Sequence, residues 1–240
     1  MTLPTLRKLS VIIPVYNERD AIESVIDRVK ASIVRQGLDA EIVVVNDGSK
    51  DGSADIIRKI PGIVFIDKVA NEGKGSAVRA GIEGASGDLL IIQDADNEYD
   101  PDDYTAMIAP IVAGTADLTL GSRFRLDRPV FWGEDKSPYL THYIGNHLII
   151  WVTNLLYWKS FTDYEGCYKA FSAHLAAAIP IRSKGFEYDN ELICKAFRRG
   201  LSVVEVPIRY EPRTYLEGKK ITWKHGVRML WTILWCRFLD

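Results

Sequence analysis

Cysteine is scarce in this sequence. The 240 residues include only Cys167, Cys194 and Cys236, which are too few and too widely spaced for a disulfide framework or for the paired ligands of a structural zinc site. Such usage is typical of a reducing compartment, so we expect a cytoplasmic protein. Residues 1–5 contain no apolar run of the kind found in secretory signal peptides, which agrees with that expectation.

Net charge is also nearly absent, at −2, and the hydrophobic share of 47% excludes an intrinsically disordered chain. The charge is nevertheless unevenly divided. Residues 195–240 contain ten Lys or Arg and four Asp or Glu, a local charge of about +6, so the first 194 residues carry about −8. The acidic first part of the chain could bind a metal ion, and the basic C-terminal part could bind an anionic partner. The alternative is that the basic residues form an ordinary solvated surface. No nucleic-acid partner is expected.

Short apolar runs alternate with helical patterns in the first half of the chain. Because the runs are β-branched and continuous, they predict a mostly parallel sheet that is covered by helices on both faces. The expected strands are residues 9–15, 41–46, 63–67, 88–93 and 117–121. Asn17 is placed to cap the helix that follows the first strand, and Asp100 with Pro101 predicts the start of another helix.

The second half is less regular. Residues 201–210 predict a strand, and residues 141–158 and 221–239 predict helices. No linker, repeat or low-complexity stretch separates the halves, so we interpret the chain as one domain with two functional subregions. Ligands of such sheets bind beyond the carboxyl ends of the strands, and these ends are where functional residues are expected.

Polar residues follow the second and fourth expected strands. Asp47 stands where a carboxylate can accept hydrogen bonds from a ribose or a base, although Asp-Gly-Ser also suits an ordinary turn or helix cap. Asp94, Asp96, Glu98 and Asp100 lie within seven residues and would repel one another unless a cation offset them. Hard Mg²⁺ or Mn²⁺ prefers such oxygens, whereas a solvated acidic turn is the alternative. The spacing excludes an EF-hand.

Residues 71–76, with the sequence Asn-Glu-Gly-Lys-Gly-Ser, form a glycine-rich entry into a helix. The upstream glycine of a Walker A motif is missing, because position 68 is lysine, and Val78 breaks the dinucleotide-binding pattern. The backbone N–H groups of such an entry can still hold an anion. This signal is weak when it is taken alone.

Several short motifs then follow one another in a definite order. They lie at residues 14–18, 46–49, 71–75, 94–96, 121–124, 163–169, 185–189, 206–208 and 213–220. This ordered set, which spans nearly the whole chain, resembles family 2 glycosyltransferases of GT-A fold. The chain most resembles the dolichyl-phosphate mannose synthase type, which loads a sugar onto a polyprenyl phosphate.

The resemblance implies a fold and a division of labour. The fold would be a single Rossmann-like three-layer α/β/α domain, and its mostly parallel sheet would be mixed because it carries an antiparallel strand. Residues 1–121 would bind the nucleotide sugar and the metal, and residues 122–240 would bind the acceptor. The partners would be a GDP- or UDP-hexose and a polyprenyl (dolichyl or undecaprenyl) phosphate, with Mg²⁺ or Mn²⁺ as cofactor.

The resemblance also implies roles for single residues. The donor-binding set would be Pro14, Tyr16, Glu18, Asp47, Lys74, Gln93, Asp94, Ala95 and Asp96. The metal would be held by Asp94 and Asp96, with Glu98, where relatives have Gln, as a possible third ligand. Phosphates of donor or acceptor would be contacted by Arg123, Arg213, Lys219 and Lys220. The catalytic set would be Asp94, Asp96, Arg123 and Asp189. Asp189, Glu165 and Glu187 are candidates for positioning, or for a general base if the acceptor is a hydroxyl.

The implied chemistry is a single displacement with inversion, which gives a β-linked product from an α-linked donor. A phosphate monoester is already anionic at neutral pH, so its attack needs no strong general base. A soluble or glycan hydroxyl acceptor is the first alternative, and a non-enzymatic nucleotide-sugar-binding or scaffold protein is the alternative of another class. A sugar-1-phosphate nucleotidyltransferase is disfavoured because its glycine-rich, arginine-containing loop is absent after residues 9–15.

Two helices raise the question of the membrane. Residues 137–158 lack charged side chains, but polar residues leave an apolar core of only residues 148–158, about 16 Å against a hydrocarbon layer of about 30 Å. A buried helix or an interfacial helix is therefore favoured over a span. Residues 221–239 combine an apolar stripe with a basic one, which suits a membrane surface as well as a core. The apolar stripe consists of Trp223, Val227, Leu230, Leu234 and Phe238, and the basic one of Lys220, Lys224 and Arg228. We expect peripheral association with a cytoplasmic membrane face, and a separate membrane subunit remains an open possibility.

Overall fold

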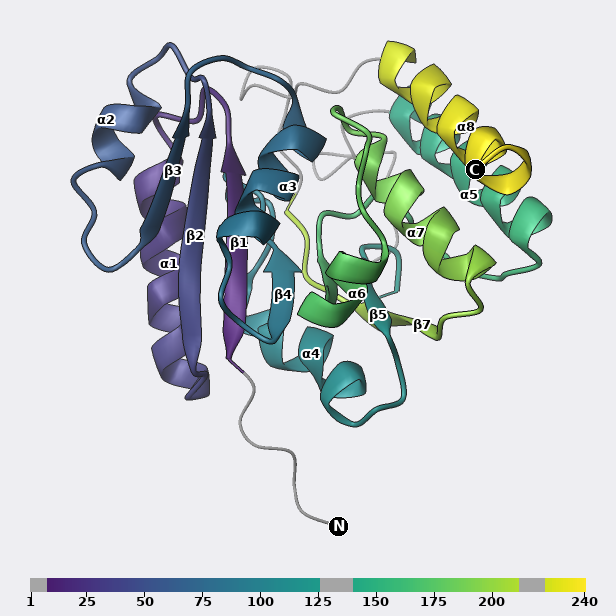
Figure 1. Ribbon diagram of the computed structural model, residues 1–240, viewed down its shortest axis with the longest axis horizontal. Helices are drawn as coiled ribbons and strands as arrows, with labels where there is room; N and C mark the ends of the chain where they lie inside the picture. The colour runs from purple at the N-terminus through teal and green to yellow at the C-terminus, as the bar shows by residue number, and fades with distance from the viewer. Residues whose placement is uncertain (1–7, 126–139, 212–222) are drawn as a thin grey trace.

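The computed structural model describes residues 8–125, 140–211 and 223–240 (Figure 1). Seven strands form a sheet in the order β3-β2-β1-β4-β6-β5-β7. They are β1 (Leu9–Val15), β2 (Ala40–Asp47), β3 (Val64–Lys68), β4 (Leu89–Ile92), β5 (Leu118–Ser122), β6 (Lys169–Ser172) and β7 (Val203–Pro207). The first five confirm the strands that the apolar runs predict. The predicted strand at residues 201–210 is shorter in the structure than in the sequence pattern.

The sheet is mixed, as the resemblance implies. β1 pairs in parallel with β2 and β4, whereas β6 runs antiparallel between β4 and β5. β1 and β4 are buried along their whole length, which explains why their sequences are continuous apolar runs instead of alternating ones. The parallel strands bring their carboxyl ends to one edge of the sheet, where the polar residues that follow them lie together.

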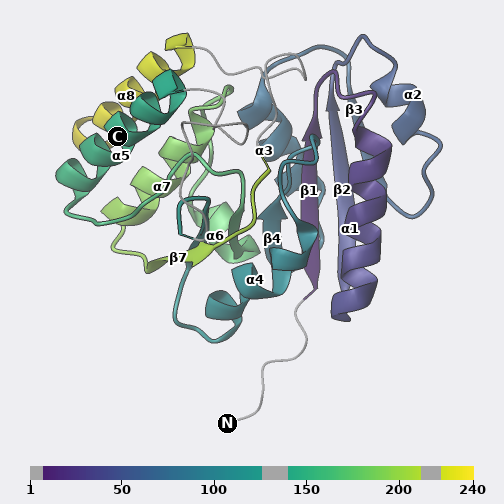
Figure 2. The same cartoon turned by 180° about the vertical axis from the view of Figure 1, so that it is seen from behind.

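Helices cover both faces of this sheet. α3 and α7 lie in front of it in Figure 1, and α1 lies in front when the molecule is turned in Figure 2. The helices are α1 (Ile22–Gln36), α2 (Ser53–Ile57), α3 (Lys74–Gly84), η1 (Pro101–Asp103), α4 (Tyr104–Val112), α5 (Leu140–Tyr157), α6 (Ala173–Ala178), α7 (Tyr188–Arg198) and α8 (Trp223–Phe238). The three-layer α/β/α architecture is therefore confirmed.

α5 and α8 lie side by side at the end of the molecule opposite β3, and both contact α7 (Figures 1 and 2). Their bounds agree with the two helices that the sequence predicts there. Within the described residues, no helix has both the length and the apolar character that crossing a bilayer requires.

Two predicted helix starts have different outcomes. Asp100 does cap η1, since its side chain accepts a hydrogen bond from the Asp102 N–H and Pro101 follows it. The prediction for Asn17 was wrong. α1 begins at Ile22, five residues after Asn17, and Asn17 adopts a left-handed φ of 51°. Its side-chain oxygen accepts the N–H of Lys50 at 2.8 Å, so Asn17 ties the end of β1 to the loop after β2.

The glycine-rich entry into α3 is closed by protein groups. The N–H groups of Gly75 and Ser76 donate to the carbonyl oxygens of Gly185 and Lys184, each at 3.2 Å, and the N–H of Gly73 donates to Asp47 at 2.8 Å. These donors are therefore not available to a phosphate, and the anion-binding interpretation of this loop was wrong. The glycines instead let the segment before α7 approach α3 closely.

This close approach makes Gly75 a sensitive position. A Cβ there would overlap the carbonyl oxygen of Ser183 and lie 2.8 Å from the Cβ of Tyr188. We predict that Gly75→Ala lowers the free energy of unfolding by about 1–3 kcal/mol, although alanine is the better helix former. Chemical denaturation measures the change. The matched control is Gly145→Ala in α5, where a Cβ meets nothing within 4 Å and no loss is expected; equal stability of the two variants would contradict the prediction.

Candidate active site

A cavity of about 930 Å³ opens at the carboxyl ends of the strands. It is lined by residues that follow β1, β2, β4 and β5, by the starts of α3 and α7, and by one face each of α5 and α8. The predicted site residues that line it are Pro14, Tyr16, Glu18, Asp47, Lys74, Asp94, Ala95, Asp96, Glu98, Arg123 and Asp189. The structure thus brings together side chains that lie far apart in the sequence.

Four predicted residues are not among them. Arg213, Lys219 and Lys220 lie outside the described residues. Gln93 is buried and does not line the cavity. Its Oε1 accepts the hydroxyl groups of Tyr104 and Tyr168, each at 2.7 Å. The donor-binding assignment of Gln93 is corrected accordingly: its side chain supports the start of the acidic loop from within the core.

Asp47 is almost fully buried at the end of β2, and its carboxylate already holds several donors. It accepts the Lys68 ammonium at 2.5 Å and the N–H groups of Glu72 and Gly73. The turn after β2 is closed by another side chain, because the N–H of Ser49 donates to Asn46. Asp47 therefore joins β2 to the loop that leads into α3, and a role toward a nucleoside stays a prediction.

Lys74 and Asp94 form an ion pair of 2.6 Å inside the cavity. Burial works against the charge of Lys74, but the adjacent Asp94 carboxylate outweighs it and raises the pKa of the ammonium above its usual range. Burial likewise opposes the charge of Asp94, and Lys74 reverses this and lowers the pKa of the carboxyl. The first acidic residue after β4 is thus held ionised by the first residue of α3.

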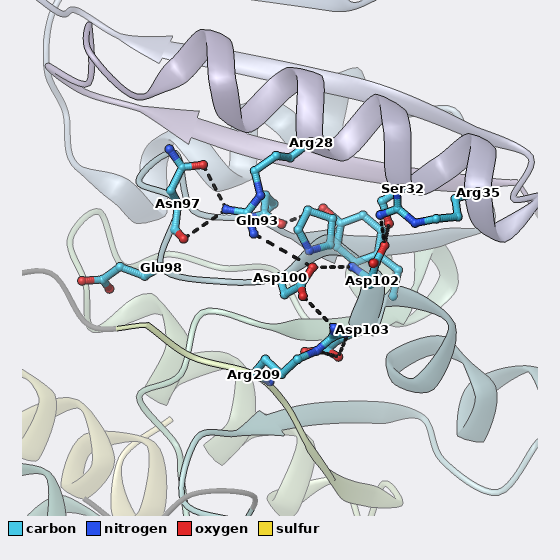
Figure 3. A network of polar contacts seen from close by, with 12 residues as sticks. Arg28, Ser32, Arg35, Gln93, Asn97, Glu98, Asp100, Asp102, Asp103 and Arg209 are labelled. Atoms are coloured by element: carbon cyan, nitrogen blue, oxygen red, sulfur yellow. Dashed lines mark hydrogen bonds and ion pairs between the residues drawn. The ribbon is translucent and has the colours of Figure 1, made fainter. Parts of the chain in front are cut away.

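The acidic loop after β4 is fixed to α1 (Figure 3). Arg28 donates to the carbonyl and to the side-chain oxygen of Asn97, at 3.2 and 3.1 Å, and Asn97 has a left-handed φ of 63°. Further along the loop, Ser32 donates to Asp102 at 2.7 Å, and Arg35 pairs with the same carboxylate. The conformation that presents Asp96 is therefore determined by a helix on the far face of the sheet.

A segment after β7 holds the same loop from its other side. Arg209 bonds Asp103 and Asp100, each at 2.7 Å (Figure 3), and the N–H of Glu211 donates to the carbonyl of Glu98 at 2.9 Å. The Tyr210 hydroxyl donates to the Glu98 carboxylate at 3.2 Å. This segment precedes residues 212–222, so the donor-side loop is bonded to the chain that leads into the predicted phosphate-binding loop.

Two further buried ion pairs each contribute one side chain to the cavity wall, Arg123 in one pair and Asp189 in the other. Arg123 donates to both oxygens of Asp163, at 2.7 and 3.0 Å, and Lys169 lies 2.9 Å from Asp189. Burial opposes the charge of Asp163, yet Arg123 lowers the pKa of this carboxyl below its usual range. The pKa of Asp189 is raised, because burial outweighs the opposing effect of Lys169.

The partners Asp163 and Lys169 were not assigned roles by the sequence analysis, although both lie in a quoted motif. One signal was available: Lys169 opens a strand whose next residues are apolar, and a buried lysine requires an acidic partner. The contribution of α8 to the cavity, through residues 225–230, had no such signal. It depends on how α8 packs beside α5.

The carboxylates that follow β4 are the candidate ligands for a metal ion. In the part of the chain that the structure describes, no three His, Cys, Asp or Glu side chains form a group that could hold one. Asp94 and Asp96 nevertheless face one cavity from a single loop. A Mg²⁺-type ion commonly takes one or two carboxylates and completes its coordination with phosphate oxygens and water, so the pair fits such an ion. Glu98 as a third ligand stays a prediction.

Comparisons with known proteins agree with this geometry. Residues 10–175 match the family model described as glycosyl transferase family 2. The low-salt glycan biosynthesis hexosyltransferase Agl6 of Haloferax volcanii is 30% identical over 92% of this chain, which covers 53% of that protein. The undecaprenyl-phosphate 4-deoxy-4-formamido-L-arabinose transferase of Edwardsiella ictaluri is 30% identical over 90% of this chain, with 63% of that protein covered. The chain therefore spans about half to two thirds of the length of these two relatives.

A similar fold is found among solved structures. Glucosyl-3-phosphoglycerate synthase from Mycobacterium tuberculosis, crystallised with Mn²⁺, UDP and phosphoglyceric acid, matches with a TM-score of 0.74 at 20% sequence identity. The match covers 98% of this chain and 80% of that one. The likeness confirms the GT-A fold.

The buried pair of Arg123 and Asp163 leads to a stability prediction. We expect Arg123→Met to lower the free energy of unfolding by about 3–5 kcal/mol at neutral pH, because Asp163 would be left buried without its cation. Below the usual aspartate pKa of about 3.9 the difference from the wild type should shrink, since protonation removes the stranded charge. Denaturant titrations at neutral and acidic pH measure both effects.

The matched control is Arg58→Met, which removes an exposed arginine that pairs with Asp55 and Asp67 at the surface. A change of less than about 1 kcal/mol is expected there. If Arg123→Met were as stable as this control, Arg123 would not be required to compensate Asp163.

Proposed function

Because the chain belongs to glycosyl transferase family 2, we propose that it transfers a hexose from a GDP- or UDP-hexose to a polyprenyl phosphate, with inversion and with the help of Mg²⁺ or Mn²⁺. The observation that carries this proposal is the extent of the cavity. It continues from the acidic loop after β4 to the facing sides of α5 and α8. One end is suited to a nucleotide sugar and the other to an acceptor with an apolar chain.

At the donor end, Pro14, Tyr16, Glu18 and Asp47 would surround the nucleoside, since they line the cavity at the ends of β1 and β2. Lys74 lies beside Asp94 and would face the diphosphate as a buried cation. Asp94 and Asp96 would hold the metal ion. When bound, this ion offsets the negative charge that builds on the departing nucleoside diphosphate.

At the acceptor end, a phosphate oxygen would attack the anomeric carbon while the bond to the nucleoside diphosphate breaks. The phosphate is already anionic, so the carboxyl group of Asp189 would position the reactants instead of removing a proton. Arg123 would contribute positive charge to this wall, although Asp163 already holds two of its N–H groups. Arg213, Lys219 and Lys220 remain proposed phosphate ligands.

The relatives support a lipid-linked acceptor. One relative is named as an undecaprenyl-phosphate transferase and another as a hexosyltransferase. α5 and α8 support the same idea, because each exposes a row of large apolar side chains. The exposed residues are Ile144, Leu148, Trp151 and Leu155 on α5, Trp158 directly after it, and Val227, Trp231, Leu234, Trp235 and Phe238 on α8. We propose that this apolar face, with the exposed Arg228 beside it, rests on a membrane surface that contains the acceptor.

The proposed reaction is tested by product analysis. The protein is incubated with GDP- or UDP-hexoses, Mg²⁺ or Mn²⁺, and either a polyprenyl phosphate, the corresponding polyprenol or a soluble sugar acceptor. We predict a lipid-linked product only with the phosphate, a β-anomeric proton in its NMR spectrum, and loss of activity with EDTA. Asp96→Asn should lower kcat by about 100-fold.

The control for this experiment is Asp55→Asn, which changes an exposed carboxylate of α2 and should leave kcat unchanged. Transfer to the polyprenol or to the soluble sugar instead of the phosphate would establish the hydroxyl-acceptor alternative. A product that retains the α-linkage would exclude single displacement.

The membrane contact is tested by flotation with vesicles. We predict that the protein floats with anionic vesicles and that Trp151→Ser combined with Trp231→Ser reduces the bound fraction by about tenfold, because both indoles are more than half exposed on the apolar face. The control pair is Val34→Ser with Val69→Ser, which removes apolar side chains that are also exposed but lie outside this face. Equal flotation of the two double variants would argue against the apolar face as the contact.

A further inference from the structure

The loop before β6 places a carboxyl group, Glu165, beside three ion pairs of the cavity. Three carboxylates around this part of the cavity each have a cationic partner within 3 Å. These ion pairs are Lys74–Asp94, Arg123–Asp163 and Lys169–Asp189. Glu165 lies among them and also lines the cavity, yet the described residues give it no ion pair. Ionisation of Glu165 would therefore add a negative charge that none of these three cations is free to compensate.

The contacts of Glu165 hold its carboxyl group in place without neutralising it. Its Oε1 accepts the side-chain N–H of Asn190 at 2.8 Å, and its backbone N–H donates to Asp163 at 3.0 Å. No hydrogen bond to the second oxygen, Oε2, is found among the described residues. A protonated Oε2 would thus remain able to donate to a ligand in the cavity.

The charged surroundings favour the neutral form. Burial is the largest effect and raises the pKa of Glu165 to about 7. The nearby Lys169 lowers this pKa, whereas the carboxylates of Asp189 and Asp163 raise it further. The other titratable groups around it are Arg123, which is bound to Asp163, and the buried thiol of Cys194 on α7. Each charged neighbour is engaged in a pair of its own, so none is left to compensate an ionised Glu165.

We propose that Glu165 is a specificity-determining residue, which donates a hydrogen bond from its neutral carboxyl group to the phosphate of the acceptor. This inference rests on the proposed function, because it assigns a recognition role at the acceptor end of the same site. A neutral carboxyl group can bind an anion that an ionised one would repel. Glu165 in its ionised form therefore excludes phosphate, and its protonation admits it.

A consequence follows for proton balance. Above about pH 7 the free protein carries an ionised Glu165, so binding of a phosphate dianion requires the uptake of a proton. The affinity should then fall by about tenfold for each pH unit above 7. The change in affinity is caused by the titration of the Glu165 carboxyl group and not by that of the ligand, since the phosphate monoester is already ionised in that range.

The test is calorimetric titration of farnesyl phosphate into the intact protein from about pH 7 to about pH 9, in pairs of buffers with different ionisation enthalpies. We expect proton uptake approaching one per ligand and a falling affinity in the wild type. Glu165→Gln, which keeps the size and the contact with Asn190, should bind with an affinity that does not depend on pH and with no uptake. His225→Gln, which changes another titratable residue of the cavity, should keep the uptake.

The outcomes separate this inference from the proposed function. Binding without proton uptake in the wild type, or the same uptake in Glu165→Gln, would overturn the role of Glu165 while the phosphate acceptor stands. Loss of the uptake in His225→Gln would overturn it as well, since the proton would then belong to α8. Failure of farnesyl phosphate to bind at any pH, when farnesol or a soluble sugar binds, would overturn both.

Thermal unfolding at about pH 8 checks that the variant folds. Glu165→Gln should be no less stable than the wild type, because it removes a charge that burial disfavours.

Discussion

The ion pair between Lys74 and Asp94 joins α3 to the end of β4 inside the cavity, and much of the surrounding structure depends on it. Lys74 is the first residue of α3, and Asp94 follows β4, so the pair connects a helix on one face of the sheet to a strand end in its centre. α3 in turn contacts the segment before α7 through Gly73 and Gly75. The position of α7, which carries Asp189, is therefore set by the same helix that neutralises Asp94.

Charge compensation is the constraint that organises the rest of the site. Parallel strands bring their carboxyl ends together, and here those ends carry several acidic side chains in a partly buried place. Each ionised carboxylate needs a cation or several N–H donors, because an uncompensated buried charge costs several kcal/mol. Asp163 has Arg123 and Asp47 has Lys68 with two backbone N–H groups. A donor diphosphate with its metal ion would bring both signs of charge into this arrangement without leaving either one unpaired.

The acidic loop after β4 is restrained from two directions, by Arg28 of α1 and by Arg209 after β7. Neither arginine lies in the cavity wall. This arrangement fixes the backbone that presents Asp96 while its carboxylate faces the cavity. It also connects the loop to the chain before residues 212–222 through the contacts of Glu98 with Tyr210 and Glu211. The acidic loop and the chain before residues 212–222 are therefore bonded to each other.

Local patterns were sufficient for the elements of the sheet and for the edge where the cavity lies. Continuous apolar runs predicted β1 to β5, and the polar residues after β2 and β4 indicated the functional edge. Contacts between distant segments decided what the sequence could not. The amides at the start of α3 are bound by carbonyl groups more than a hundred positions away, and Gln93 is turned into the core by Tyr104 and Tyr168. Asn17 has the side chain of a helix cap but bonds the next loop instead.

The helices α5 and α8 show most clearly why an apolar pattern alone was ambiguous. The predicted stripe of α8 suited either a core or a membrane surface, and the structure shows which of the described side chains lie in the core. α8 buries Met229, Ile233 and Cys236, whereas Val227, Leu234 and Phe238 of the predicted stripe are exposed. The exposed apolar side chains remain hydrated, so they contribute no hydrophobic stabilisation to the folded protein in water. Since both helices also line the cavity, a surface that covered their outer face would lie directly beside the part of the cavity that they line.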